Sequence, residues 1–295
     1  MFEGFAHRRI AASGAEIHAA VGGDGPPLLL LHGFPQTHAM WRHVAPRLAE
    51  RFTVVAADLR GYGQSEKIPG DPAHVRHCKR TVAQDQVEVM RALGFERFYV
   101  AGHDRGARVA HRMALDHPER VQRLAVLDIL PTLHVFEAAD QAMATAYYHW
   151  FFLIQPNGLP EHAIGLDPEY WLRRLLGSIG TGGAGGEVFD GEAFAEYLRA
   201  FRDPATVHAM CEDYRAGASI DLDHDRKDRA EGRRVACPTL ALWGERSVVG
   251  RLYDDQLGIW RRYAPQAEGH GVPAGHFLPE ERPAEVTEAL LRFFA

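Results

Sequence analysis

The sequence predicts a doubly wound α/β fold: a mostly parallel sheet covered by helices on both faces, with a block of helices inserted between two strands. Short apolar runs alternate with longer segments of helical periodicity, the pattern of strands buried on both faces. This alternation stops near Pro131 and resumes at Cys237. A length of 295 residues suits one large domain with an inserted piece.

Five continuous apolar runs are predicted to be the buried strands. They are residues 27–31, 53–58, 98–102, 121–128 and 239–244. The less regular stretch at residues 6–21 is predicted to be an antiparallel hairpin on one edge of the sheet. Between the strands, we expect a helix at 81–93, ended by Gly94, and another at 107–117, stopped by Pro118.

The inserted block contains no convincing buried strand and is predicted to be helical. We expect its helices at residues 135–153, 168–179, 191–201 and 204–217. Seven glycines between positions 177 and 191 predict a mobile surface loop, and the mixed charges of 221–234 predict a solvated return segment rather than a binding patch. The predicted domains are therefore a core of residues 1–131 and 235–295 and a helical cap of 132–234.

The composition and charge of the chain argue against several classes of binding partner and cofactor. The formal net charge is −6, which argues against nonspecific binding of nucleic acids. No apolar stretch approaches the roughly 20 residues of a membrane span, and no secretory signal is visible at the start. Cys78, Cys211 and Cys237 support neither a zinc site nor a disulfide framework, and no phosphate or dinucleotide loop is present. We expect a cytoplasmic protein without a cofactor.

A nucleophile elbow is predicted at Gly102-His103-Asp104-Arg105-Gly106. It follows a predicted strand and opens a predicted helix, and a sharp turn of this kind needs small residues two positions before and after its centre. Asp104 stands where a serine hydrolase has serine, next to the positive end of a helix dipole. The alternative is that Asp104 only caps this helix.

Two further residues complete a candidate triad in the chain order nucleophile, acid, histidine. His276 lies in a glycine-containing loop before the last predicted helix and is the candidate base. Asp128 ends a predicted strand and is the candidate acid that orients the imidazole, with Glu245 as the weaker alternative. The loop His32-Gly33-Phe34-Pro35 also ends a strand. We expect the backbone N–H groups of Phe34 and Arg105 to form an oxyanion hole, with the Phe34 ring as a pocket wall.

These segments together resemble the α/β-hydrolases, and among them the fluoroacetate (haloacetate) dehalogenases. The resemblance covers most of the chain. It rests on HGFPQT from position 32, DLRGYGQS from 58, GHDRGARVAHR from 102, LDILPT from 127, YHWFF from 148 and AGHFLPEE from 274. It implies a haloacetate as substrate and a homodimer as a candidate oligomeric state.

The residue types then suggest the chemistry. A carboxylate is ionised near pH 7 and displaces halide from an sp³ carbon without a base, which leaves an ester on Asp104. Water activated by His276 and Asp128 would hydrolyse this ester. Serine would instead leave a stable ether, so an aspartate suits haloalkanoates, haloalkanes or epoxides.

Arg105 and Arg108 favour a substrate carboxylate. They are three positions apart and lie on one helix face, where two guanidinium groups bind a carboxylate by charge-assisted hydrogen bonds. The resemblance further implies a halide site formed by His149, Trp150 and Tyr214 of the cap, although the neighbouring Tyr147 and Tyr148 leave the third donor open. By residue type alone, such aromatic side chains are more often plain core.

Two alternatives compete with this prediction. An epoxide hydrolase would share the aspartate nucleophile and use two cap tyrosines, such as Tyr148 and Tyr214, to protonate the epoxide oxygen. Arg105 and the His149-Trp150 pair count against it. A non-catalytic binding protein of the same fold commonly lacks one member of the triad, and all three candidates stand here.

Overall fold

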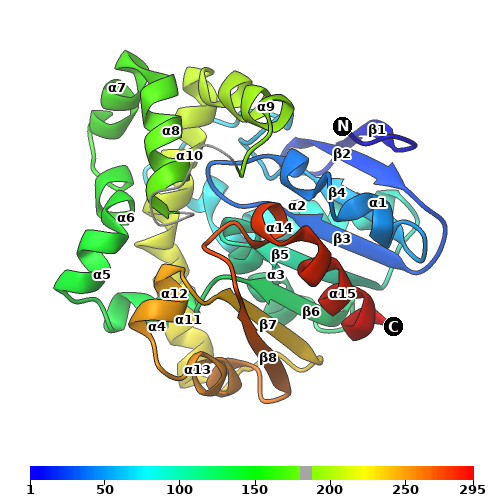
Figure 1. Ribbon diagram of the computed structural model, residues 1–295. Coiled ribbons are helices and arrows are strands. Elements are labelled where there is room, and N and C mark those ends of the chain that lie inside the picture. The colour runs from blue at the N-terminus through cyan, green and yellow to red at the C-terminus, as the bar shows by residue number, and fades with distance from the viewer. Residues whose placement is uncertain (180–187) are drawn as a thin grey trace.

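The computed structural model describes residues 1–179 and 188–295, and it confirms the predicted doubly wound sheet (Figure 1). Within these residues, eight strands form one sheet in the order β1-β2-β4-β3-β5-β6-β7-β8. The β1–β2 and β2–β4 pairs are antiparallel and the other pairs are parallel. The strands are β1 (Ala6–Ala11), β2 (Glu16–Gly22), β3 (Pro27–Leu31), β4 (Thr53–Ala57), β5 (Phe98–His103), β6 (Val121–Leu127), β7 (Thr239–Gly244) and β8 (Ala267–Val272).

Helices outside the insertion pack against the sheet and bury its apolar strands. They are η1 (His38–Trp41), α1 (Ala45–Leu48), η2 (Val75–His77), α2 (Lys79–Ala92), α3 (Arg105–Asp116), α12 (Val248–Leu252), α13 (Gln256–Tyr263), α14 (Leu278–Glu281) and α15 (Pro283–Phe294). The predicted helices at 81–93 and 107–117 correspond to α2 and α3. No helix in the described ranges has the length and apolarity needed to cross a membrane.

In its described residues, the segment between β6 and β7 contains helices joined by loops and no strand, and α5–α10 gather beside the sheet (Figure 1). Its helices are α4 (Thr132–Glu137), α5 (Gln141–Ala146), α6 (Tyr148–Leu153), α7 (Leu159–Leu166), α8 (Pro168–Ile179), α9 (Gly191–Phe201), α10 (Pro204–Gly217) and α11 (Ile220–Ala230). Helices α8, α9 and α10 have the predicted bounds. The predicted glycine-rich loop at 177–191 falls largely on residues 180–187, which lie outside the described residues.

The single helix predicted over 135–153 is wrong, because three short helices, α4, α5 and α6, occupy this stretch. The Asp140 side chain accepts a hydrogen bond from the Met143 N–H and so caps a new helix at Gln141. The backbone of Tyr147, with φ −103° and ψ 37°, then separates α5 from α6. Apolar periodicity continued through both breaks, so it did not show them.

The return segment predicted at 221–234 is mostly exposed, as expected, and most of it forms helix α11. Asp221 and Asp228 of this helix are buried. Asp228 is paired with Arg112 of α3 at 2.5 Å, and Asp221 accepts a hydrogen bond from the Lys79 backbone N–H at 2.9 Å. A charge-rich segment can still be buried on one side when its carboxylates meet cations and N–H groups of the core.

Strand β8 was missed because its sequence, AEGHGV, lacks an apolar run. A Cβ atom on Gly269 would lie 1.9 Å from the carbonyl oxygen of Ala241 in β7. The glycine therefore permits a close backbone approach, and it also removes the side chain that would mark a strand.

Candidate active site

The elbow between β5 and α3 holds Asp104 in a strained backbone conformation, with φ 43° and ψ −115°. The turn depends on its glycines: a Cβ on Gly102 would lie 2.5 Å from the Gly106 oxygen, and one on Gly106 would lie 2.4 Å from the His32 oxygen. The Asp104 side chain makes no capping hydrogen bond to α3. Capping therefore does not explain why an aspartate occupies this turn.

Asp104 is buried, and one of its carboxylate oxygens accepts a hydrogen bond from the backbone. The Phe34 N–H donates to Asp104 Oδ2 at 3.1 Å. A Cβ on Gly33 would lie 2.6 Å from the Asp104 Cβ, so the loop after β3 needs a glycine to pack against the elbow. Burial by itself would raise the pKa of Asp104, but nearby His276, Arg105 and Arg108 lower it below its ordinary value. Asp104 is therefore a carboxylate near neutral pH.

His276 and Asp128 come from distant parts of the chain and meet at the carboxyl ends of the strands. Asp128 Oδ2 accepts from His276 Nδ1 at 2.6 Å, while Oδ1 accepts from the Gly244 N–H at 2.8 Å and from Ser247 Oγ at 2.7 Å. Burial opposes protonation of His276, but Asp128 and Asp104 outweigh it and raise the pKa of the imidazole. The alternative acid, Glu245, is exposed, and no hydrogen bond joins it to His276 among the described residues.

Arg105 is buried and pairs with a residue of α10. Its Nε donates to Asp213 Oδ2 at 2.6 Å and its Nη2 donates to the Asp213 carbonyl at 2.7 Å. Its guanidinium carbon lies 4.1 Å from the centre of the Tyr214 ring. Two consecutive residues of α10 therefore fix the orientation of this cation.

Arg108 is also buried, yet no carboxylate forms an ion pair with it in the described part of the chain. Its Nη1 donates to the Leu130 carbonyl at 3.0 Å and to Thr132 Oγ1 at 2.9 Å, and its Nε has no partner. The guanidinium carbon lies 4.7 Å from the Trp150 ring centre. Burial and the charge of Arg105 lower the pKa of Arg108. The site thus contains a cation without a full set of partners.

The aromatic side chains of α6 and α10 that are predicted to bind halide lie together around Phe34. The His149 ring stacks on Phe34 with centroids 6.0 Å apart, and the Tyr214 ring meets Phe34 edge-on at 5.2 Å. Trp150 stacks on Tyr147 at 5.4 Å and meets Tyr214 at 6.3 Å. His149 is buried, its Nδ1 has no partner, and burial lowers its pKa to about 3. It is therefore a neutral imidazole near pH 7.

The sequence reasoning missed the residues that hold these groups in place. Asp213 pairs with Arg105, with Lys79 and with the Tyr62 hydroxyl, the last at 3.1 Å. Burial would raise the pKa of Asp213, but Arg105 and Lys79 lower it. In the sequence, Asp213 is notable only as an acid directly before Tyr214, and this position does not indicate which residue it pairs with. No sequence feature pointed to Ser247, which donates a hydrogen bond to Asp128.

Comparison with known proteins shows the fold and the family of the chain. Residues 26–283 match the family model described as the alpha/beta hydrolase fold. A fluoroacetate dehalogenase from Burkholderia sp is 47% identical, with 100% of this chain and 95% of that protein covered. A soluble epoxide hydrolase from Corynebacterium sp. (strain C12) is 36% identical, with 98% and 97% covered. The crystal structure of ALR0039 from Nostoc sp PCC 7120, provisionally named an alpha/beta hydrolase, is 54% identical, with a TM-score of 0.97 and 100% and 99% covered.

Proposed function

Because the chain belongs to the alpha/beta hydrolase superfamily and, within it, to the family of the fluoroacetate dehalogenases, we propose that it converts fluoroacetate or chloroacetate to glycolate and halide. The observation that carries this proposal is the buried Arg108, which has no acidic partner among residues 1–179 and 188–295 and is close in sequence to the proposed nucleophile Asp104. We assign residues 1–131 and 235–295 to the hydrolase core and 132–234 to a cap that covers the site.

In the first step, Asp104 Oδ1 attacks the carbon that carries the halogen. The C–O bond forms as the carbon–halogen bond breaks, and the bonding pair leaves with the halide. Oδ2 is already bound by the Phe34 N–H, so it becomes the carbonyl oxygen of the ester. A low pKa keeps Asp104 ionised, so this step needs no base.

In the second step, water attacks the carbonyl carbon of the ester. His276 accepts a proton from this water, and Asp128 stabilises the imidazolium that forms. The tetrahedral oxyanion develops on Oδ2, where the Phe34 N–H is in place to stabilise it, with the Arg105 N–H as the proposed second donor. As the tetrahedral intermediate collapses, the bond to the glycolate oxygen breaks and the His276 imidazolium returns its proton to that oxygen. Asp104 is left as the carboxylic acid and loses its proton to solvent, which restores the carboxylate.

Arg108, with Arg105 beside it, is the proposed site for the substrate carboxylate. Arg105 is already paired with Asp213, whereas Arg108 has an unpaired Nε. A substrate anion would supply the missing partner and offset the cost of burying this cation. His149, Trp150 and Tyr214 are the proposed donors to the departing halide. A neutral His149 donates one ring N–H without holding the product by full charge.

An epoxide hydrolase is the second candidate, because an epoxide hydrolase from Corynebacterium is also similar over nearly the whole chain. The Tyr214 ring faces Phe34, and Tyr148 borders His149 with ring centroids 5.9 Å apart. Either hydroxyl would protonate an epoxide oxygen. Arg108 argues against this function, because an uncharged epoxide leaves its guanidinium unpaired.

Halide release tests the proposed function directly. We expect the purified protein to release halide from both fluoroacetate and chloroacetate, as measured with halide-selective electrodes, and to leave styrene oxide unhydrolysed. Release from chloroacetate alone would retain the nucleophile and remove the support for the cap donors. Diol formation from the epoxide without halide release would establish the second candidate instead.

The Arg108→Met variant tests whether Arg108 binds the substrate carboxylate, because methionine fills similar space without charge. Loss of a charged hydrogen bond of about 1.5–3 kcal/mol predicts a fall of roughly 10–100-fold in kcat/KM for chloroacetate. Hydrolysis of uncharged 2-chloroethanol should not fall. Arg91→Met, at an exposed position of α2, is the matched control. An equal loss for both substrates would show that Arg108 does not recognise the carboxylate.

The pH dependence should separate the two steps. The raised pKa of His276 means that it is protonated, and inactive as a base, at pH values above those expected for free histidine. The rate of ester hydrolysis should therefore fall as the pH drops through this raised pKa. Alkylation requires only ionised Asp104 and should persist to more acidic pH. Rapid-quench measurements with chloroacetate resolve both rates, and a parallel loss of both would contradict these separate roles.

A further inference from the structure

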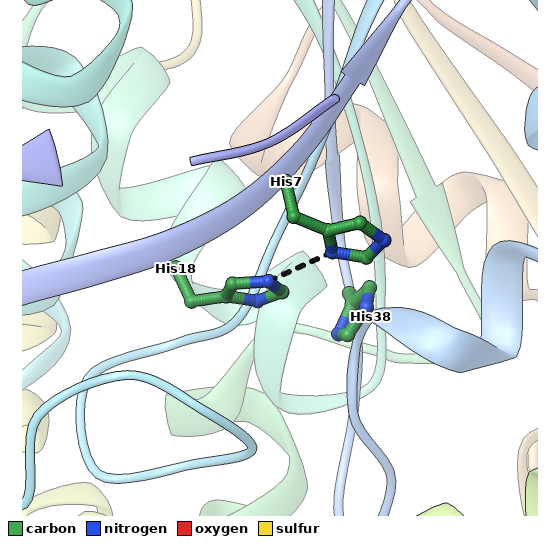
Figure 2. Close-up of side chains that lie close together, drawn as sticks. All are labelled: His7, His18 and His38. Atoms are coloured by element: carbon green, nitrogen blue, oxygen red, sulfur yellow. Dashed lines mark hydrogen bonds between the residues drawn. The ribbon is translucent and has the colours of Figure 1, made fainter. Parts of the chain in front are cut away.

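Three histidines meet at the edge of the sheet, in a cluster that the proposed reaction does not use. His7 lies on β1, His18 on β2 and His38 on η1 (Figure 2). One ring nitrogen from each lies within 4.8 Å of those of the other two, and His7 Nδ1 lies 3.0 Å from His18 Nε2. Imidazole nitrogens gathered in this way are characteristic ligands of zinc, copper and nickel rather than of calcium or magnesium.

The fold itself brings these side chains together. In the β1–β2 ladder, Arg9 is the partner of His18, so His7 is a diagonal neighbour of His18 on the same face. Beyond β4, the Asp58 N–H donates to the His18 carbonyl at 2.9 Å and continues the pairing with β2. The η1 helix then places His38 over the same carboxylate.

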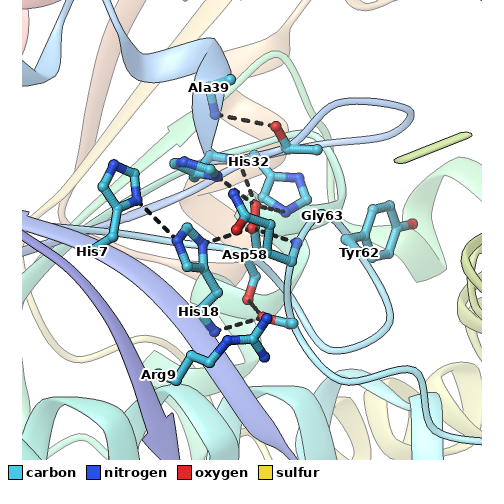
Figure 3. A network of polar contacts seen from close by, with 12 residues as sticks. His7, Arg9, His18, His32, Ala39, Asp58, Tyr62 and Gly63 are labelled. Atoms are coloured by element: carbon cyan, nitrogen blue, oxygen red, sulfur yellow. Dashed lines mark hydrogen bonds and ion pairs between the residues drawn. The ribbon is translucent and has the colours of Figure 1, made fainter. Parts of the chain in front are cut away.

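Asp58 binds two of the three rings, and Figure 3 shows its contact with His18. Its Oδ2 accepts from His18 Nδ1 at 2.9 Å, and its Oδ1 accepts from His38 Nδ1 at 3.0 Å. An ionised carboxylate only accepts, so both Nδ1 atoms carry the hydrogen, and a neutral ring keeps its lone pair on Nε2. A carboxylate behind the ligand histidine is the usual outer partner at metal sites, where it fixes the tautomer and the ring orientation.

The charge balance around Asp58 also favours a cation. Asp58 is fully buried, and within the described residues its ion-pair partners are all histidines: His18, His32 and His38. No lysine or arginine of the described residues pairs with it. The backbone N–H groups of His38 and Gln64 also donate to Asp58, at 2.8 and 2.9 Å, so hydrogen bonds already stabilise its negative charge. A divalent ion bound through His18 and His38 would add a positive charge close to this carboxylate.

We propose that His7, His18 and His38 bind a divalent transition metal ion of the zinc type, with Asp58 orienting two of the ligands. A tetrahedral zinc ion with Zn–N bonds of about 2.0–2.1 Å needs ligand nitrogens roughly 3.3 Å apart, so the 3.0 Å between His7 and His18 needs only a small movement. His7 is exposed, which leaves the fourth position to water.

Such an ion would stabilise structure rather than take part in catalysis. It would tie the β1–β2 hairpin to η1, which begins directly after the loop that contains Phe34. The Phe34 N–H binds Asp104, so the ion would stabilise the segment that directly follows this loop. The inference does not depend on the proposed function, because metal affinity and thermal stability are measured without any substrate.

Titration calorimetry of the chelator-treated full chain with ZnCl₂ tests the proposal. We expect one Zn²⁺ per chain with micromolar or tighter affinity, and a rise in Tm of roughly 3–6 °C when free Zn²⁺ is about 100-fold above Kd. His7→Ala should weaken binding by at least about 10–100-fold. His270→Ala, at another exposed histidine, is the matched control and should bind like the unchanged protein.

Because His7 is exposed, its replacement should leave the metal-free fold intact. His7→Gln serves the same comparison if the alanine variant is not recovered folded. Absence of Zn²⁺ binding to the unchanged protein, or equal affinity in the His7 variants and the control, would overturn the proposal. The cluster would then be a metal-free hydrogen-bond relay on Asp58. Anomalous diffraction at the zinc edge should place the ion between the three rings.

Discussion

Replacing Asp104 with asparagine is expected to abolish the turnover of haloacetates, with kcat reduced by at least roughly 10⁴-fold. The amide cannot displace halide as a carboxylate does, although it retains the shape of the side chain and an oxygen to accept from the Phe34 N–H. Asparagine also tolerates the positive φ at this position better than most residues. Halide release measured with chloroacetate is the readout.

Asp24→Asn, at an exposed position, is the matched control for this change and should retain full activity. A small fall in the Tm of Asp104→Asn is expected, because the low pKa of Asp104 means that its charge stabilises the fold. If a folded Asp104→Asn protein kept even a hundredth of the original rate, Asp104 would not be the nucleophile.

Replacing His276 with asparagine should separate the two steps by stopping the second one. Asp104 remains ionised and attacks without a base, so each active site should release one halide. The ester should then accumulate, because loss of the general base slows its hydrolysis by about 10²–10⁴-fold. Mass spectrometry of the intact protein and of the peptide that contains Asp104 should show one added carboxymethyl group.

His270→Asn, six positions away and exposed, is the control and should turn over without accumulating the adduct. A stoichiometric burst of chloride with a modified Asp104 peptide would support both the covalent step and the role of His276. An unmodified peptide from folded His276→Asn protein, after incubation with chloroacetate, would exclude the covalent mechanism.

Much of the sheet was predictable because its strands are buried on both faces and therefore read as continuous apolar runs. The predicted runs at 27–31 and 239–244 have the bounds of β3 and β7. Strand β8 was not predictable in this way, because Gly269 replaces a side chain where two backbones approach closely. The breaks on either side of α5 were missed for another reason. They depend on a capping side chain and one backbone angle, which apolar periodicity does not report.

Some residues of the candidate site could likewise be identified from local sequence features, whereas others could be identified only from contacts between distant parts of the chain. Asp104 could be identified from the sequence because the sharp turn of the elbow needs small residues on both sides. Gly102 and Gly106 meet this need within five residues. Asp128 and His276 stood out because each lies in a loop at the end of an expected strand or before a helix. The roles of Asp213 and Ser247 were invisible, because each acts through a partner more than 100 residues away in the chain.

The sequence by itself determined the fold class, the helical insertion and the position of the elbow, because these follow from periodicity and from steric limits within a few residues. Only the tertiary structure decided that Asp213 pairs with Arg105, that Arg108 has no acidic partner in the described part of the chain, and that His7, His18 and His38 meet over Asp58. Such contacts join strands and helices whose neighbours are set by the order of the whole sheet. Their charge balance therefore exists only once the chain has folded and excluded water from them.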